Sequence, residues 1–429
     1  MEGAAVAESV RNFAILAGAA ALVALVARRF AIQYTVALVL FGLGLAVLAP
    51  HLSLVITPEV VLLVLLPGLV FEAAYHMDLA ELRSSFGWVV ILAAPGVLVS
   101  AAVVAVVLHL AAGLPLDLAF VVGAIVSATD PAAVVATFRT MRAPPRLATL
   151  VEAESLFNDG TAIVLFSVAV RIVLGPVEPA DIVVSVVGTV LISAVIGAVA
   201  GFVATWIVAR VDDHLVELTI SVVLAYGTYL AADEIHESGI IATVVAGIVL
   251  GTYGRRIGLS DRAKEALDIV WEFTAFLLTA LVFLLVGLAI TLSDLAGAIV
   301  PIAWGVVAII IGRAFVVYVM LGVPARLISR GRGSTAIPLA WLHVMFWAGL
   351  RGAVAVALAL SLPIDMPQRA LLQSITFGIV LFTLLVQGTT IDLLLRKTGV
   401  GGSGPAPEPA IEAAAANGAT PRPGPATDP

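Results

Sequence analysis

The sequence predicts an all-α polytopic membrane protein with thirteen transmembrane helices. The chain has 429 residues, of which 61% are hydrophobic and only 12% are charged. Long apolar runs recur from residue 12 to residue 394, and about 20 helical residues suffice to cross the hydrocarbon core of a bilayer. The basic residues gather in alternate connections between these runs. Each observation favours a helical bundle in a membrane.

The predicted spans begin close to the start of the chain. Residues 1–10 contain Glu2 and Glu8 but neither Lys nor Arg, so the first run is interpreted as a retained span and not as a secretory leader. The spans are 12–27, 34–49, 58–75, 87–111, 117–138, 147–173, 183–209, 215–232, 238–253, 267–291, 296–322, 337–360 and 368–394.

The distribution of Lys and Arg predicts the orientation of the chain. With the N-terminus outside, the outer connections hold three basic residues: Arg11, Arg171 and Arg369. The inner connections hold sixteen: Arg28, Arg29, Arg83, Arg139, Arg142, Arg146, Arg210, Arg255, Arg256, Arg262, Lys264, Arg326, Arg330, Arg332, Arg396 and Lys397. We therefore expect the C-terminus on the cytoplasmic side. One missed or invented span would destroy this asymmetry.

The end of the chain differs in composition from the rest. Residues 398–429 contain seven prolines and few large apolar side chains, so this segment cannot bury a core and is predicted to be a disordered cytoplasmic tail. The preceding residues, 1–397, form the transmembrane domain. The chain has no cysteine, which excludes disulfides and thiolate metal sites.

The span 147–173 carries three carboxylates, Glu152, Glu154 and Asp159. Acidic residues at membrane depth are costly and often mark ion or proton routes, although a carboxylate paired with an arginine can also be purely structural. On a helix, Ser155 and Asp159 share a face with Glu152, while Glu154 and Asn158 lie four apart on the adjacent face. One face can offer oxygens to a cation, and the other can offer a carboxylate steadied by an amide.

Two spans are interrupted near their middle. Pro131 follows Asp130 within 117–138 and disfavours helix at that point. In 337–360, Gly349 and Gly352 flank Arg351. The alternative is two ordinary kinks, but a charged residue inside each break favours two broken helices that cross.

The surroundings of these two spans repeat. Residues 87–173 and 296–394 share the order long span, broken span, long span, and they start seven spans apart. An odd offset inverts the second copy relative to the first. The pattern is typical of inverted-repeat transporters, in which broken helices meet at the midplane.

Four motifs resemble the cation:proton antiporter-1 family, the NhaP-type sodium/proton exchangers. They are TDPAAV (129–134), ESLFNDGTAIVLF (154–166), IHESGIIATVVAGIVLG (235–251) and GLRGAVAVALAL (349–360). The similarity covers residues 10–397. One departure is Ala153, where the family usually has glycine.

The family resemblance implies a division of the transmembrane domain. A core or transport bundle would comprise 87–173 and 296–394, and a dimerisation part would comprise 12–75 and 183–291. It further implies a homodimer in the cell membrane, a secondary active transporter and not an enzyme, with no cofactor. The partners would be the lipid bilayer and the two transported ions, with no nucleic acid.

The same resemblance assigns an ion site. Asp159 would bind the cation and exchange the proton, and Na⁺ would also be bound by Ser155 and the backbone of Thr129. Asp130 and Glu72 are also counted among the ion-binding residues. Asp130 would lie at the crossing and compensate the positive N-terminal ends of the half-helices, a role that the helix macrodipole also predicts.

The remaining charged residues receive supporting roles. By the resemblance, Glu154 would pair with Arg351, and Asn158 would hold that glutamate. Glu72 would lie near the ion path; the alternative is that it reaches the inner membrane surface nearby. Arg313, alone in its span, is expected to neutralise a core carboxylate or carbonyl ends.

These assignments predict an electroneutral antiporter with alternating access. Cation and proton would compete for Asp159, and only a loaded, neutral site would cross readily, because moving a bare carboxylate through a low dielectric is costly. Na⁺ or Li⁺ is the expected cation, and a K⁺/H⁺ exchanger on the same scaffold is the alternative. A cation channel is disfavoured, because AYGTY (225–229) lacks the potassium-filter pattern. Intramembrane-protease motifs are absent from the sequence.

Overall fold

The computed structural model describes residues 2–30, 33–48, 59–175, 178–331 and 337–400. All regular secondary structure in these ranges is helical, as the sequence predicts. Helices occupy each of the thirteen predicted segments. Within the described residues, nine helices are long and apolar enough to cross a membrane, and two further apolar helices are shorter. The predicted tail after residue 400 lies outside the described residues.

The first half of the chain ends with the helix that carries Asp159. Its elements are α1 (Glu2–Phe30), α2 (Tyr34–Leu48), η1 (Val60–Leu65), α3 (Leu66–Tyr75), α4 (Leu79–Ile91), η2 (Leu92–Gly96), α5 (Val97–Ala112), α6 (Leu116–Ser127), α7 (Ala132–Met141) and α8 (Pro145–Leu174).

The second half begins with helices that the family resemblance assigns to the expected dimerisation part. Its elements are α9 (Pro179–Val208), α10 (His214–Asp233), α11 (Gly239–Val249), η3 (Leu250–Gly254), α12 (Arg255–Ile257), α13 (Asp261–Ala289), α14 (Leu292–Gly297), α15 (Ile299–Ala314), η4 (Phe315–Leu321), α16 (Gly322–Gly331), α17 (Leu339–Trp347), α18 (Ala353–Leu360), α19 (Arg369–Phe382), η5 (Thr383–Gly388) and α20 (Thr389–Thr398).

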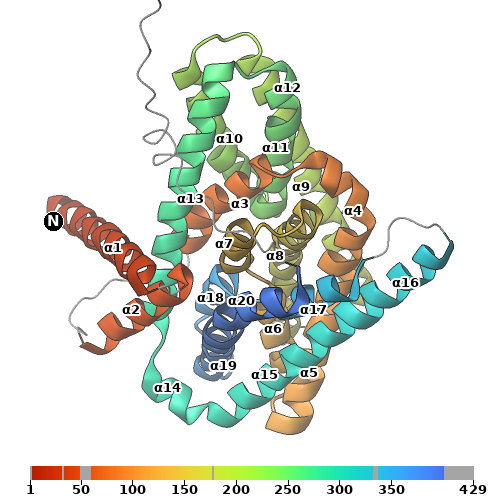
Figure 1. Cartoon of the computed structure of the whole chain (residues 1–429). Helices are drawn as coiled ribbons and strands as arrows, with labels where there is room; N and C mark the ends of the chain where they lie inside the picture. The colour runs from red at the N-terminus through yellow and green to blue at the C-terminus, as the bar shows by residue number, and fades with distance from the viewer. Residues whose placement is uncertain (1, 31–32, 49–58, 176–177, 332–336, 401–429) are drawn as a thin grey trace, which may run out of the picture.

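Two groups of helices are distinct in Figure 1. Helices α9 to α12 lie together at one end, and α5, α6, α15 and α19 gather at the other. Helices α1 and α2 project to one side, where they pack against α13. The crossing segments lie between the two groups, so the candidate site sits in the middle of the bundle.

Both predicted breaks are present. Helix α6 ends at Ser127 and α7 begins at Ala132, with Pro131 immediately before it. Helix α17 ends at Trp347 and α18 begins at Ala353. Each break leaves helix ends with unpaired backbone groups inside the bundle, and these groups need partners.

Within the part of the chain that the structure describes, five spans contain a π-helical turn, η1 to η5, which the sequence did not predict. Turns of this kind widen the helix locally and free backbone groups, and they often occur at functional sites. Two of them lie near the crossing: η4 begins at Phe315, two residues after Arg313, and η5 begins at Thr383.

A buried acid fixes the start of α13. Glu217 on α10 is fully buried, and its carboxylate accepts hydrogen bonds from the Ser260 backbone N–H at 3.0 Å and from the Ser260 hydroxyl at 2.9 Å. Ser260 in turn caps α13 by accepting from the Ala263 N–H. This contact joins α10 to α13 at the end of the bundle away from the crossing.

Candidate functional site

Asp159 lies on α8 at the wall of a cavity with a volume of about 170 Å³. The side chain is nearly buried, and its Oδ1 has no hydrogen-bond partner among the described residues. The other charged or polar side chains that line the cavity are Glu72, His76, Thr129, Asp130, Arg139, Glu152 and Thr279. An unpartnered carboxylate oxygen in a cavity is an open position for a cation or a proton.

Neutral oxygens lie close to this carboxylate. Thr129 lines the same cavity, and its hydroxyl is 3.0 Å from the hydroxyl of Ser155, which precedes Asp159 by one helical turn. Both side chains are buried. Carboxylate, hydroxyl and backbone oxygens are the hard ligands that alkali cations prefer. The residues present therefore fit a small monovalent cation as cargo.

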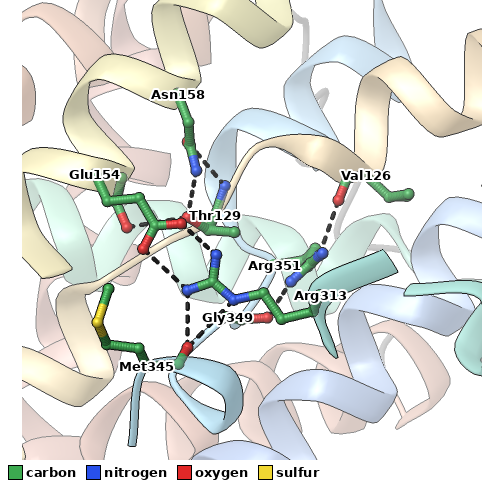
Figure 2. A network of polar contacts seen from close by, with 9 residues as sticks. Val126, Thr129, Glu154, Asn158, Arg313, Met345, Gly349 and Arg351 are labelled. Carbon is green, nitrogen blue, oxygen red and sulfur yellow. Dashed lines mark hydrogen bonds and ion pairs between the residues drawn. The ribbon is translucent and has the colours of Figure 1, made fainter. Parts of the chain in front are cut away.

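Both the nitrogen and the oxygen of the Asn158 side-chain amide form hydrogen bonds with Thr129. Its Nδ2 donates to the Thr129 hydroxyl at 2.6 Å, and its Oδ1 accepts from the Thr129 N–H at 3.2 Å (Figure 2). The expected support of Glu154 by Asn158 is therefore wrong. The break in the first crossing segment leaves the Thr129 N–H without a helical partner, and an amide satisfies that donor and the side chain together.

Asp130 contacts the N-terminal ends of two half-helices. Its Oδ1 accepts from the Ala132 N–H of α7 at 3.0 Å, and its Oδ2 accepts from the Ala353 N–H of α18 at 3.4 Å. Its own N–H donates to the Leu350 carbonyl at 2.9 Å. A carboxylate between two positive helix ends is the arrangement that the macrodipole argument predicts. Participation of Asp130 in ion binding stays a prediction.

Glu154 pairs with Arg313 and not with Arg351, so the predicted ion pair is wrong. Arg313 Nη2 donates to Glu154 Oε2 at 2.9 Å, and Nη1 donates to Oε1. The guanidinium also reaches the Met345 carbonyl in the last turn of α17, from Nη2 at 2.8 Å and from Nε at 3.2 Å (Figure 2). Arg313 thus neutralises both a core carboxylate and a carbonyl end.

Arg351 neutralises carbonyl ends. Its Nε donates to the Val126 carbonyl in the last turn of α6 at 2.8 Å, and its Nη1 donates to the Gly349 carbonyl just after α17 (Figure 2). Its own N–H donates to the Thr383 hydroxyl at 3.1 Å. At the crossing, the negative charge of Asp130 lies at two positive helix N-termini, and the positive charge of Arg351 lies at two negative C-terminal ends. Each of the four helix ends thus faces a side chain of opposite charge.

Glu72 lies at the cavity and forms an ion pair that the sequence analysis missed. Its Oε1 is 3.3 Å from His76 Nδ1, and His76 Nε2 is 3.3 Å from Asp268 Oδ1 on α13. Arg255 holds Asp268 with two hydrogen bonds of 2.6 and 2.9 Å. The four-residue spacing of Glu72 and His76 was a signal that could have found the first of these contacts.

The surroundings of His76 favour its charged form. Partial burial alone would lower the pKa of His76, but the hydrogen bond and charge of Glu72, together with the charge of Asp268, raise it above its ordinary value of 6.5. His76 is the residue that follows α3, and its side chain is 29% exposed. His76 bridges Glu72 on α3 and Asp268 on α13 beside the cavity, and protonation of the imidazole strengthens both contacts.

The charged groups at the crossing include one more carboxylate than guanidinium. Arg313, Arg351, Glu154 and Asp159 are buried there, and Asp130 is half-buried. Glu154 is matched by Arg313, and Asp130 is matched by backbone donors. When all five groups are ionised, the net charge is negative by one. Neutralising Asp159 with either a proton or a monovalent cation removes this excess.

Comparison with known proteins identifies the family. The family described as "Sodium/hydrogen exchanger, transmembrane" matches residues 17–397. The chain belongs to this family. The match spans both crossing segments and the helix that carries Asp159, as the motif resemblance predicted.

Named relatives agree with this family membership. The chain is 38% identical to the Na⁺/H⁺ antiporter ApNhaP of Aphanothece halophytica over 378 residues, covering 86% of this chain and 70% of that protein. It is 35% identical to the Na⁺/H⁺ antiporter NhaP of Pseudomonas aeruginosa over 358 residues, covering 80% and 82% respectively. Each alignment includes most of the membrane domain.

A solved structure has the same fold. The sodium proton antiporter MjNhaP1 from Methanocaldococcus jannaschii, at pH 8, superposes with a TM-score of 0.73 at 20% sequence identity. The superposition covers 92% of this chain and all of that one. The likeness supports the arrangement of helices.

Proposed function

We propose that this protein is an electroneutral Na⁺/H⁺ antiporter in which Asp159 binds Na⁺ and H⁺ alternately. The observation that carries the proposal is the Asp159 carboxylate, which lies in a cavity with its buried Oδ1 unpartnered among the described residues. Family membership and the antiporter relatives support Na⁺ as the cation.

Cation binding uses oxygens already placed at the site. Asp159 supplies the charge, and Ser155 and the backbone of Thr129 replace part of the hydration shell of Na⁺. Asn158 positions Thr129 through two hydrogen bonds, so it acts on the site without touching the ion. Glu72 faces the same cavity and contributes through its charge or through a bridging water.

The charge balance couples the two ions. With Asp159 ionised and empty, the core carries an uncompensated carboxylate, which is costly to move through a low-dielectric barrier. Binding of either Na⁺ or H⁺ restores neutrality. The ion site therefore moves between the two sides of the membrane only when Asp159 carries Na⁺ or H⁺. This condition makes the exchange of the two ions obligatory.

Electroneutrality follows from the roles of the other charged groups. Glu154 is engaged by Arg313, and Asp130 accepts hydrogen bonds from the N–H groups of two half-helices, so the exchanged proton is assigned to neither carboxylate. Asn158 cannot titrate. One Na⁺ then exchanges for one H⁺ and no net charge moves.

The cavity is assigned to the cytoplasmic side in this arrangement. It extends from Asp159 to His76 and Arg139, and the distribution of basic residues supports a location of these helix ends inside the cell. The protein would lie in the cell membrane, with the N-terminus outside and the C-terminus inside. Two copies would associate through the dimerisation part.

Reconstitution tests the proposal. Purified protein in proteoliposomes with an imposed pH gradient should dissipate that gradient on addition of Na⁺ or Li⁺, and a comparison with K⁺ and Rb⁺ measures selectivity. The Asp159→Asn variant should be folded and should show no cation-dependent proton movement. The control is Asp117→Asn, an exposed carboxylate at the start of α6, which should exchange like wild type. Coupled exchange by a folded Asp159→Asn variant would refute the assignment.

A further inference from the structure

Gln33 joins two parts of the molecule that are far apart in the sequence. It lies just before α2, and its Nε2 donates to the Ala133 carbonyl in the first turn of α7 at 2.9 Å. Helix α2 belongs to the expected dimerisation part, and α7 belongs to the expected core. This hydrogen bond therefore crosses the boundary along which the two parts would move.

The other end of the same amide faces the core as well. A Cβ added at Gly388, the last residue of η5, would lie 3.0 Å from Gln33 Oε1. Gln33 Oε1 and the neighbouring Gln387 Oε1 are both buried without a hydrogen-bond partner among the described residues. We call this contact of Gln33 with α7 and η5 the joint. It has one hydrogen bond, from Gln33 to Ala133, and two buried acceptor oxygens without a hydrogen-bond donor among the described residues.

The unmet acceptors determine how strong this joint can be. A buried acceptor without a partner is destabilising, and a single hydrogen bond contributes little net free energy. The joint thus stabilises the present arrangement weakly. A weak polar contact is suited to an interface that must open and close in every cycle.

Both core segments that meet Gln33 connect directly to the breaks. Ala133 lies three residues after Asp130, and η5 contains Thr383, whose hydroxyl accepts from the Arg351 N–H. Gln33 therefore contacts one segment that leads to the first break, α7, and one that leads to the second break, η5. A movement of the core relative to α2 would change both contacts together.

We propose that Gln33 is a positioning residue for exchange: a releasable tie that holds the core against α2 in the inward-facing arrangement and separates when the core moves outward. The inference rests on the proposed antiport function. In this account the tie adjusts the ratio of the two arrangements without touching the ion, because Gln33 is not among the residues that line the Asp159 cavity.

Side-dependent kinetics test the tie. Gln33→Met keeps the length of the side chain but removes the donor, which should shift the ratio of inward to outward arrangements roughly two- to tenfold. The apparent KM for Na⁺ should then rise in everted vesicles, where the cytoplasmic face is exposed, and fall in right-side-out vesicles. A purely structural defect would not move the two values in opposite directions.

Gln373 provides a matched control. Its Nε2 donates to the Ala359 carbonyl at 2.9 Å, the same kind of bond, but both residues belong to the expected core. Gln373→Met should leave both KM values unchanged. Equal KM values for Gln33→Met and wild type on both faces, or shifts in the same direction, would overturn the proposal.

Cross-linking tests the separation itself, and the absence of native cysteine makes the background clean. A Gln33→Cys/Gly388→Cys variant treated with a short bifunctional thiol reagent should lose at least tenfold in exchange, with recovery on reduction. The control is Tyr34→Cys/Phe276→Cys, which links stacked rings of α2 and α13 within the dimerisation part and should keep exchange.

The outcomes separate the two proposals. Full exchange by the cross-linked Gln33→Cys/Gly388→Cys variant would overturn the tie while leaving antiport intact. If wild-type protein showed no Na⁺-dependent proton movement, the proposed function itself would fail. If this cysteine variant is inactive before cross-linking, the vesicle kinetics of Gln33→Met still decide the question.

Discussion

Arg313 on α15 and Glu154 on α8, which are 159 residues apart in the sequence, form a two-point ion pair. Both side chains are buried. Glu154→Ala or Arg313→Ala should lower the free energy of unfolding by about 3–5 kcal/mol, because each leaves an uncompensated buried charge. The double variant should recover part of that loss. Thermal melts of the detergent-solubilised protein measure the effect.

An exposed ion pair serves as the control for this prediction. Lys264→Ala breaks the Lys264–Asp261 contact on the surface, where solvent screens the charges, and should leave the melting temperature nearly unchanged. If Glu154→Ala and Arg313→Ala melt like wild type and only the apparent affinity for Na⁺ changes, the pair belongs to the transport site and not to the scaffold.

Gly352 lies directly against the carboxylate of Asp130. A Cβ at this position would collide with Asp130 Oδ2, the atom that accepts from the Ala353 N–H. Gly352→Ala should therefore displace the cap of α18, cost about 1–3 kcal/mol of stability and reduce exchange. Gly188→Ala, with open space around the added methyl group, is the control. Wild-type stability and rate for Gly352→Ala would show that the cap tolerates displacement.

His76 should make the stability of the protein depend on pH. Its pKa is raised above 6.5 by Glu72 and Asp268, against the lowering effect of burial, so the folded state holds the proton more tightly than the unfolded state. The contribution is fully present below pH 6.5 and is lost as pH rises through the raised pKa. The melting temperature of wild type minus that of His76→Gln should shrink over that interval. A difference that stays constant with pH would contradict this prediction.

The sequence predicted the helices and breaks well, because both depend on local signals. Apolar length defines a span, and Pro131 and the two glycines around Arg351 interrupt helices wherever they occur. The place of Asp130 could also be predicted, since a half-helix N-terminus attracts a carboxylate irrespective of the rest of the fold.

The partners of Glu154 and Asn158 could not be predicted in the same way. Two arginines, Arg313 and Arg351, are buried near Glu154, and spacing along one helix cannot decide which of them approaches from another helix. The four-residue spacing of Glu154 and Asn158 suggested a contact, but the broken segment offered Asn158 both a donor and an acceptor at Thr129. The π-helical turns have no local sequence signal of comparable strength.

Exchange should be insensitive to membrane voltage. Only Asp159 is expected to alternate between Na⁺ and H⁺, because Asn158 cannot titrate and Glu154 is held by Arg313. Each net charge crossing the membrane would couple at about 2.3 kcal/mol per 100 mV. Proteoliposomes with voltage set by valinomycin and K⁺, at fixed Na⁺ and pH gradients, should therefore exchange at a constant rate. A rate that changes with voltage, and becomes constant in Glu72→Gln, would show that Glu72 carries a second proton.

The release of protons on Na⁺ binding tests the central claim most directly. Weakly buffered, detergent-solubilised protein is titrated with Na⁺ at a pH where Asp159 is protonated, while bound Na⁺ and released H⁺ are measured together. The account predicts one proton released for each Na⁺ bound by wild type, and neither binding nor release by Asp159→Asn. Na⁺ binding without proton release, or binding by Asp159→Asn with wild-type affinity, would contradict it.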